Sequence, residues 1–330
     1  MLEKKEDCDS GFDSLENAIK KVIDIASAAK KRSSQISGIA THIQTLDEKM
    51  GGLQPSDLII LAGRPSMGKT SLATNIAFNI ANAYNHNGTT EENEGGVVGF
   101  FSLEMSSEQL ATRIISEQTE VSSSDIRRGR ISEEQFSKII RVTEQLKKAP
   151  LYIDQTGGIS VPQLAARARR LKRQYGLDIL IIDYIQLMTS DLKYSSEYRM
   201  QEITAELKAL AKELNIPILA LSQLSRQVEN RTDKSPKLSD LGGFGSIEQD
   251  ADIVLFIYRE EYYLRNEEPK IGSLEHAKWQ DEMDKIMGKA DVIVAKQRHG
   301  PTGIVSLAFQ SDFTRFSDLA DSNYLPEQIG

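Results

Sequence analysis

The sequence has almost no cysteine, no long hydrophobic run and no apolar leader at its start. Cys8 is the single cysteine among 330 residues, so an internal disulfide is impossible, and no cysteines and histidines have the spacing of a metal site. Residues 1–7 lack an apolar h-region, and no later run approaches about 18 consecutive apolar residues. These absences exclude a disulfide-rich secreted domain and a membrane-spanning protein, and they favour a cytoplasmic location.

An excess of positive charge is also missing. Lysine and arginine number 40 against 48 aspartates and glutamates, for a formal net charge of −8, which excludes a broad basic surface for nucleic acid. Any contact with DNA must therefore be local. With 27% charged residues, 39% hydrophobic residues and no low-complexity tract, the composition is that of a globular enzyme with one large α/β domain or two smaller ones.

What the sequence does contain is a nucleotide-binding signature. Residues 58–62 are apolar and predict a short buried strand, residues 63–70 read Gly-Arg-Pro-Ser-Met-Gly-Lys-Thr, and Leu72, Ile76 and Ile80 follow at helical spacing. A strand, a G-x-x-x-x-G-K-[ST] loop and a helix in this order form a P-loop. The alternative, a glycine-rich turn that opens a helix without binding phosphate, requires the motif to arise by chance.

The residue types of this loop suit phosphate chemistry. Gly63 and Gly68 let backbone N–H groups turn towards phosphate oxygens, and the helix that follows adds its positive N-terminal end. Lys69 is predicted to reach the β- and γ-phosphates, and the Thr70 hydroxyl to bind Mg²⁺. We therefore expect ATP and Mg²⁺ as cofactors, with the nucleotide bound by Gly63, Arg64, Pro65, Ser66, Met67, Gly68, Lys69, Thr70 and Ser71.

The order of the predicted elements indicates an α/β fold. Strands alternate with helices from the P-loop onwards, which predicts a mostly parallel twisted sheet with helices on both faces. A charged insertion at 260–288 precedes a β-hairpin at 291–309. The expected strands before the hairpin are 58–62, 97–102, 151–154, 177–183, 218–222 and 252–258, and the expected helices include 161–175 and about 195–214.

The N-terminal part is predicted to be separate from this domain. Residues 1–11 are polar and expected to be mobile, and residues 12–40 are expected to form an amphipathic helix and a linker. The apolar positions of the helix recur at three and four, which places them on one face. They cover either their own domain or a neighbouring subunit, and residues 41–330 form the main domain. The apolar face consists of Leu15, Ile19, Val22, Ala26 and Ala29.

Three polar residues follow predicted strands and are candidates for chemistry. Asp183 closes an apolar strand, where open α/β sheets bind ligands, and beside a P-loop it is predicted to be the Walker B aspartate that holds Mg²⁺ through water. Glu104 also sits at a strand end, and its carboxylate could orient and partly deprotonate the attacking water. Gln223 is placed to sense the γ-phosphate with its amide. Read alone, Asp183 is more often a loop residue and Glu104 a solvated glutamate, and the signal of Gln223 is weak.

Lys296 and Arg298 project two cations from one face of the last predicted strands. In isolation such a pair is a solvated strand edge that discourages pairing with other chains. Beside a phosphate-transfer site, the pair is predicted to act as an arginine-finger arrangement, supplied from outside to a neighbouring site.

Together these segments resemble the ATPase domain of bacterial replicative DNA helicases of the DnaB family. The resemblance covers about residues 12–320, and it depends on six segments in one order. They are Gly-Arg-Pro-Ser-Met-Gly-Lys-Thr (63–70), Phe-Phe-Ser-Leu-Glu-Met (100–105), Ile-Ile-Asp-Tyr-Ile-Gln-Leu (181–187), Leu-Ser-Gln-Leu-Ser-Arg (221–226), Gly-Ser-Ile-Glu-Gln-Asp-Ala-Asp (245–252) and Lys-Gln-Arg-His-Gly-Pro (296–301).

The resemblance implies a RecA-like core that assembles into a homohexameric ring, hydrolyses ATP between subunits and moves 5′ to 3′ along single-stranded DNA. It implies that Lys69 and Thr70 bind nucleotide and Mg²⁺, Glu104 is the catalytic carboxylate, and Asp183 and Gln223 are the Walker B and sensor residues. Lys296 and Arg298 would act in trans. For the full-length family member, primase and a helicase loader are expected partners.

Two features depart from the family pattern. Family members carry a helical domain before the linker, and this chain does not show it, so an ATPase-domain fragment is expected. The family's Asp-Leu-Arg-Glu-Ser-Gly reads Asp240-Leu-Gly242-Gly243-Phe244-Gly245 here. The predicted DNA contacts are the backbone of Gly242, Gly243, Phe244 and Gly245 and stacking on Phe244. Weaker or altered DNA binding is equally compatible with this sequence, and a flexible loop is the further alternative.

The predicted function is therefore an ATP-dependent DNA helicase motor. A rival interpretation is a DNA-binding or regulatory RecA-like ATPase that assembles without unwinding DNA. A third is an assembly-defective fragment that binds nucleotide and does little else.

Overall fold

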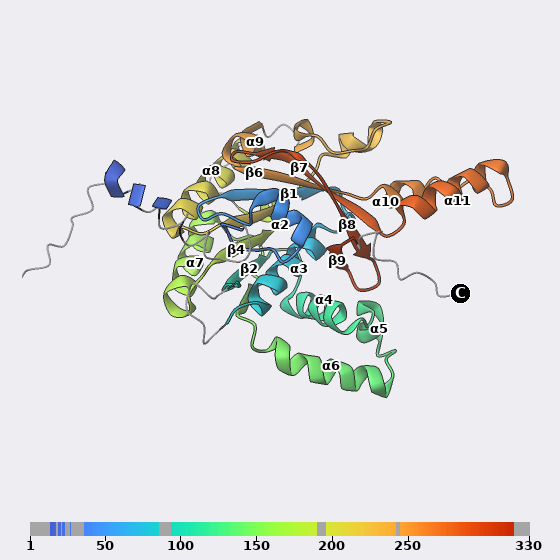
Figure 1. Cartoon of the computed structure of the whole chain (residues 1–330), viewed down its shortest axis with the longest axis horizontal. Helices are drawn as coiled ribbons and strands as arrows, with labels where there is room; N and C mark the ends of the chain where they lie inside the picture. The colour runs from blue at the N-terminus through green and yellow to red at the C-terminus, as the bar shows by residue number, and fades with distance from the viewer. Residues whose placement is uncertain are drawn as a thin grey trace, which may run out of the picture.

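A computed structural model describes residues 14–17, 19–20, 22–23, 27, 36–85, 94–189, 196–241 and 245–319. A single twisted sheet runs through the centre, and helices lie on either side of it (Figure 1). Within the described residues the strand order is β3-β2-β4-β5-β1-β6-β7-β8-β9. The strands are β1 (Leu58–Gly63), β2 (Val98–Ser102), β3 (Leu151–Asp154), β4 (Ile179–Asp183), β5 (Ile218–Gln223), β6 (Ile253–Tyr258), β7 (Lys289–Gln297), β8 (Gly303–Gln310) and β9 (Arg315–Asp318).

The first six strands along the chain pair in parallel, and β7 to β9 are antiparallel. The prediction of a mostly parallel sheet is confirmed, as is the C-terminal hairpin, which β7 and β8 form. β9 is a strand that periodicity missed, because its four residues are too short to show a pattern.

Each face of the sheet packs against its own hydrophobic core. Leu58, Ile60 and Ala62 of β1 point into one core, while Ile59 and Leu61 point into the other, as the two-residue repeat of a strand requires. The first core includes residues of α7 and α8, and the second those of α2, α3 and α4. Burial on both faces explains why β1 is apolar throughout rather than alternating.

The helices begin where the sequence provides caps. Ser106 and Gln109 form a capping box at the start of α4, and Ser132 and Gln135 form another at α6, so two amide groups are satisfied at each end. No helix in the described ranges is long and apolar enough to cross a membrane. The helices are α2 (Gln44–Met50), α3 (Lys69–Asn82), α4 (Ser107–Thr119), α5 (Ser123–Arg128), α6 (Glu133–Leu146), α7 (Val161–Tyr175), α8 (Ser196–Leu214), α9 (Gly245–Asp250), α10 (Glu260–Arg265) and α11 (Leu274–Ile286).

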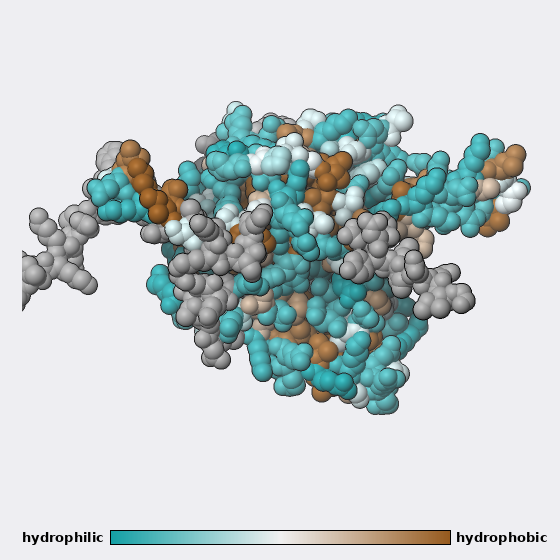
Figure 2. Space-filling model, in the orientation of Figure 1, coloured by the Kyte–Doolittle hydropathy of each residue, from teal (hydrophilic) through white to brown (hydrophobic). Residues whose placement is uncertain are grey.

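The charged insertion at 260–288 forms α10 and α11, which project from the body of the molecule (Figure 1). Trp279 holds the two helices together, since its indole N–H donates to the Leu264 carbonyl at 2.7 Å. Ile271, between the helices, and Leu274, at the start of α11, are exposed, and apolar residues are visible at the far end of this arm (Figure 2). The sequence indicated only the charge of this segment.

Helical backbone is present at residues 15–17, 19–20, 22–23 and 27, which agrees with the predicted N-terminal helix at those positions. Leu15, Ile19 and Val22 are 76%, 49% and 64% exposed, and this apolar face is visible beside the body of the molecule (Figure 2). The described part of the chain does not cover the face. Packing on a neighbouring subunit stays a prediction.

Candidate functional site

The register of the parallel strands gathers the predicted site residues at one edge of the sheet. Gly63 of β1 lies opposite Gln223 of β5, and Ser102 of β2 lies opposite Asp183 of β4. Glu104 follows Ser102 by two residues and therefore lies beside Asp183. A cavity of about 960 Å³ opens at these strand ends. Its lining includes Lys69, Thr70, Ser71, Glu104, Asp183 and Gln223.

The P-loop backbone has the shape of an anion cradle. Gly68 has a φ of +99°, which favours glycine, and a Cβ there would come within 2.9 Å of the Phe316 ring. α3 begins at Lys69, and the first amide N–H groups of a helix have no partner within it. These amides and the positive end of α3 face the cavity edge, where an anion is stabilised.

Lys69 is held by backbone oxygens at the base of the loop. Its Nζ donates to the carbonyls of Gly63 at 2.8 Å and Arg64 at 3.3 Å. Burial and, to a smaller extent, the charge of Arg64 lower the pKa of Lys69 to about 8, although Asp183 and Glu104 oppose the shift. An anion in the cavity favours the protonated ammonium, so the site is suited to bind phosphate.

Asp183 is buried at the end of β4. Burial raises the pKa of its carboxyl, Glu104 adds to the rise, and the Thr70 hydroxyl, Lys69 and Arg113 lower it. Its Oδ2 has no hydrogen-bond partner among the described residues. A buried carboxylate oxygen beside a hydroxyl fits a hard cation such as Mg²⁺, which prefers oxygen ligands. Thr70 and Asp183 are therefore the residues that would hold it.

Glu104 is an exposed carboxylate at the cavity wall. The turn that carries it is fixed, because the Leu103 N–H donates to the Asp183 carbonyl at 2.8 Å and the Ser102 hydroxyl donates to the Met105 carbonyl at 2.7 Å. A carboxylate on a fixed turn, open to solvent, has room to bind a water molecule. This is the placement that a general base requires.

Gln223 is positioned by a residue to which the sequence analysis gave no role. The Gln186 amide nitrogen donates to the Ser222 hydroxyl at 2.9 Å and to the Gln223 carbonyl at 3.2 Å, and its oxygen accepts the Gln223 N–H at 3.2 Å. Gln186 lies in η1 (Ile185–Leu187), just after Asp183. Its place in the segment 181–187 was the only available signal.

Three further lining residues had no sequence signal at all. Arg113 of α4 points into the cavity, and burial lowers its pKa while Asp183 and Glu104 oppose this. The Arg259 guanidinium lies 4.2 Å from the centre of the Phe309 ring and donates to the Ser66 carbonyl at 3.3 Å. Arg113 comes from α4, Arg259 from the residue after β6 and Phe309 from β8, so only the fold brings them to the P-loop.

Two predicted nucleotide-binding residues turn their side chains away from the cavity. The Met67 side chain is in the hydrophobic core, and the Arg64 guanidinium is buried against Glu229. Only the backbone of these residues is available to phosphate. Of the predicted DNA-contacting residues, Gly242, Gly243 and Phe244 lie outside the described residues, and Gly245 begins α9.

Lys296 and Arg298 lie at the opposite edge of the sheet from the P-loop. Lys296 pairs with Val254, near the start of β6, whereas the cavity is at the ends of the parallel strands. β1 has 6 residues, so at about 3.3 Å per residue its length separates the edges by about 20 Å. These two cations cannot reach the cavity of their own chain.

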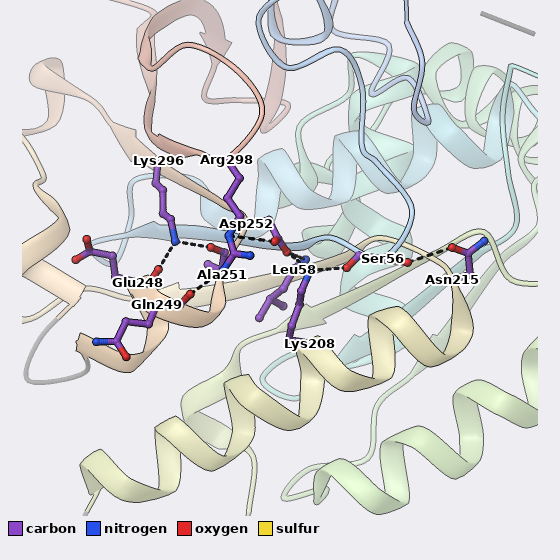
Figure 3. A network of polar contacts seen from close by, with 10 residues as sticks. All are labelled: Ser56, Leu58, Lys208, Asn215, Glu248, Gln249, Ala251, Asp252, Lys296 and Arg298. Atoms are coloured by element: carbon purple, nitrogen blue, oxygen red, sulfur yellow. Dashed lines mark hydrogen bonds and ion pairs between the residues drawn. The ribbon is translucent and has the colours of Figure 1, made fainter. Parts of the chain in front are cut away.

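Both cations instead contact the end of α9 (Figure 3). The Lys296 ammonium donates to the carbonyls of Glu248 at 2.5 Å and Ala251 at 2.7 Å. The Arg298 guanidinium donates to the Gln249 carbonyl at 3.1 Å and lies 3.5 Å from the Asp252 carboxylate. Figure 3 shows both side chains reaching the same stretch of backbone, Lys296 from β7 and Arg298 from just after it.

A buried glutamate lies behind the P-loop. Glu117 of α4 accepts a hydrogen bond of 2.6 Å from the Asn75 amide, whose oxygen accepts the Phe316 N–H at 2.7 Å. The Phe316 ring in turn lies against Gly68. Burial raises the pKa of Glu117 from 4.5 to about 7, although Asn75 and Arg315 lower it.

The Glu117 side chain should therefore make stability depend on pH. Between about pH 4.5 and 7 the folded chain holds a proton that the unfolded chain has released, so stability falls as pH rises. Glu117→Gln removes this loss and should stabilise the chain at pH 8 by about 2–3 kcal/mol. Denaturant unfolding of both proteins at pH 5, 6, 7 and 8 measures the effect.

Glu120→Gln is the matched control, because Glu120 is exposed and pairs with Arg315 at 3.0 Å. Its effect should stay below about 1 kcal/mol at each pH. A Glu117→Gln profile that is parallel to the wild-type profile would show that Glu117 does not titrate in this range.

Most of this chain matches known proteins in sequence and in fold. The family model described as "DnaB-like helicase C terminal domain" matches residues 38–318. The replicative DNA helicase DnaB of Rickettsia typhi is 49% identical over 292 residues, which cover 88% of this chain and 59% of that protein. The replicative DNA helicase DnaC of Bacillus subtilis is 39% identical over 312 residues, covering 94% of this chain and 63% of that protein.

Two solved structures share the fold. The first is an ATPase domain that superimposes with a TM-score of 0.78 at 31% identity, covering 94% of this chain and all of that one. The second is a DnaB-like replicative helicase, whose structure is described with its interactions with primase. It gives a TM-score of 0.76 at 31% identity and covers 94% of this chain and 68% of that one. These likenesses confirm the predicted RecA-like core.

This chain spans about three fifths of the length of the Rickettsia and Bacillus relatives. The residues matched by the family model contain the P-loop, the strand ends that line the cavity and the C-terminal hairpin. The match over residues 38–318, together with the identity to the Rickettsia protein, shows that this chain belongs to the family of DnaB-like helicase C-terminal domains, which bind nucleotide.

Proposed function

We propose that this chain is the ATPase motor domain of a replicative DNA helicase, which hydrolyses ATP to move 5′ to 3′ along single-stranded DNA and unwind duplex. The observation that carries the proposal is the separation of two halves of one site. Lys69, Glu104 and Asp183 line a cavity at one edge of the sheet, and Arg298 lies at the other. In this proposal Arg298 completes the cavity of a neighbouring copy, so that a complete site requires two copies of the chain.

The residues of the cavity have distinct roles in hydrolysis. The P-loop amides and Lys69 bind the β- and γ-phosphates of ATP, and Thr70 and Asp183 hold Mg²⁺. When bound, the metal neutralises charge on the phosphate oxygens. Glu104 accepts a proton from the water whose oxygen attacks the γ-phosphorus, the bond to the β-phosphate oxygen breaks, and ADP and phosphate leave. Gln223 donates a hydrogen bond to the γ-phosphate.

Contact between the two opposite edges of the sheet makes a head-to-tail interface, which closes into a ring if the rotation permits. The resemblance to the family suggests six subunits. The proposed order along the chain is the segment 1–11, the linker 12–40 and the motor domain 41–330. Leu15, Ile19 and Val22 of the linker are covered by the next subunit. Lys296 and Arg298 then reach the neighbour's γ-phosphate.

The proposed nucleic-acid ligand is single-stranded DNA, which residues 242–245 contact. The proposed location of the protein is the cytoplasm. Primase and a loader are proposed partners of the full-length protein. The interaction with primase described for a solved DnaB-like helicase supports the first of these. A RecA-like regulatory ATPase that assembles without unwinding is the alternative, and the names of the relatives favour the helicase.

A strand-displacement assay tests the proposal. With ATP, the chain should unwind a forked duplex that has a free 5′ tail, and it should displace no strand from a duplex that has only a 3′ tail. The Lys69→Ala variant should displace no strand from either substrate. Hydrolysis per chain should rise with protein concentration, because the site is shared. ATP hydrolysis without strand displacement at any concentration would favour the regulatory ATPase.

A further inference from the structure

The P-loop has a side-chain connection to the segment that precedes the predicted DNA contacts. Arg64, the second residue of the P-loop, is 7% exposed. Its Nε and Nη2 donate to one carboxylate oxygen of Glu229 at 2.9 and 2.7 Å, and its Nη1 donates to the Leu224 carbonyl at 2.9 Å. The guanidinium therefore joins the P-loop to residues 224 and 229.

A buried guanidinium is stable only when its donors are satisfied. The Arg64 guanidinium points away from the cavity, where a cation could have bound phosphate directly. Glu229 and the Leu224 carbonyl hold it in that orientation. The Leu224 N–H also donates to the Gly63 carbonyl at 3.3 Å. Backbone and side-chain hydrogen bonds therefore join the start of the P-loop to the start of the segment 224–241.

The segment 224–241 behaves as one unit because its two ends are joined. The Ser225 N–H donates to the Asp240 carbonyl at 3.0 Å. Arg231 binds both carboxylate oxygens of Asp240, at 3.1 and 2.8 Å, and the Lys237 N–H donates to the same carboxylate at 2.7 Å. Arg231, two residues after Glu229, thereby connects this part of the segment to Asp240, two residues before Gly242.

We propose that Glu229 is a positioning residue that, through Arg64, ties the P-loop to the segment 224–241 and makes DNA affinity depend on the nucleotide. The inference rests on the proposed function. Phosphate binding draws the P-loop backbone around the anion, and the rigid Arg64 guanidinium carries that change to Glu229. Glu229 does not line the cavity and stands outside the predicted DNA contacts at 242–245, so we expect its effect to be on the coupling between the two ligands.

Coupling between two ligands is reciprocal, and it is measured as one ratio. The probes are a labelled non-hydrolysable ATP analogue with Mg²⁺ and a single-stranded oligo-dT, and the ratio compares analogue affinity with and without the oligonucleotide. We expect the wild-type ratio to be about fivefold or more. In Glu229→Gln, which keeps the shape and loses the charge, it should fall below about twofold, with the DNA-free affinity within about threefold of wild type.

Glu267→Gln is the matched control. Lys234 of the same segment pairs with Glu267 at 2.9 Å, so this variant removes an ion pair from the segment without touching the P-loop. Its coupling ratio should equal that of the wild type. Thermal unfolding of both variants checks that the fold is intact, because a loss of structure lowers affinity with and without DNA alike.

The possible outcomes separate the inference from the function on which it rests. A wild-type ratio in Glu229→Gln overturns the inference and leaves the proposed function standing. A fall of more than about tenfold in DNA-free affinity also overturns it, since Glu229 would then only hold the P-loop. A wild-type protein with no coupling at all contradicts the DNA motor itself, and the role of Glu229 with it.

Discussion

Glu104→Gln should lower the rate of ATP hydrolysis by about 100-fold or more while ATP binding stays within a few-fold of wild type. Glutamine keeps the size of the side chain and its place on the turn after β2, but it cannot accept the proton of the attacking water. Nucleotide affinity should persist because Lys69 and the P-loop amides are unchanged. Single-turnover hydrolysis and binding of a labelled ATP analogue measure the two quantities separately.

Glu108→Gln is the control for this variant. Glu108 lies four residues further on, in the first turn of α4, and is exposed, so its loss should leave turnover within about twofold. If Glu104→Gln turns over ATP at the wild-type rate, Glu104 is not the base. Asp183 would then be the other carboxylate to test, because it lines the same cavity.

Mixing two inactive variants should restore ATP hydrolysis. Glu104→Gln lacks the base in its own cavity, and Arg298→Ala lacks the cation that the structure puts at the opposite edge of the sheet. At some interfaces an Arg298→Ala subunit supplies the cavity, with Glu104 present, and a Glu104→Gln subunit supplies Arg298. Both halves of the site are intact there. With random assembly at equal amounts, about a quarter of the interfaces are of this kind, so activity should rise from near zero towards a quarter of wild type.

The matched control mixes Lys69→Ala with Glu104→Gln. Both changes lie in the same cavity, so every interface keeps a defect and no activity should return. Size-exclusion chromatography with one variant labelled establishes that mixed oligomers form. Absence of recovery in the first mixture, with mixed oligomers present and Arg298→Ala still binding ATP, would mean that Arg298 does not complete a neighbour's site.

Much of the fold was predictable because its signals are local. The apolar run 58–62 became β1 with one added residue, and the helix 161–175 was predicted to the residue. Strands 151–154 and 177–183 were also recognised, the second two residues too long. In each case the signal is local, because the periodicity lies within the element and the glycine or polar residues that bound it lie next to it.

The arrangement of the site depended on strand order instead. Sequence alone could place Glu104 and Asp183 at strand ends, but the pairing of β2 with β4 is what puts them side by side. Arg113 and Arg259 line the cavity although neither stands in a recognisable motif. Contacts between residues so far apart in the chain follow from topology, which no local pattern encodes.

By itself, the sequence determined the P-loop, the parallel α/β class and the identity of the polar residues at the strand ends, because each of these depends on neighbours a few residues away. Only the tertiary structure decided that Arg64 faces Glu229 rather than phosphate, that Glu117 is buried, and that Lys296 and Arg298 lie across the sheet from their own cavity. The physical reason is that burial, charge pairing and the distance across a sheet are set by which distant segments pack together.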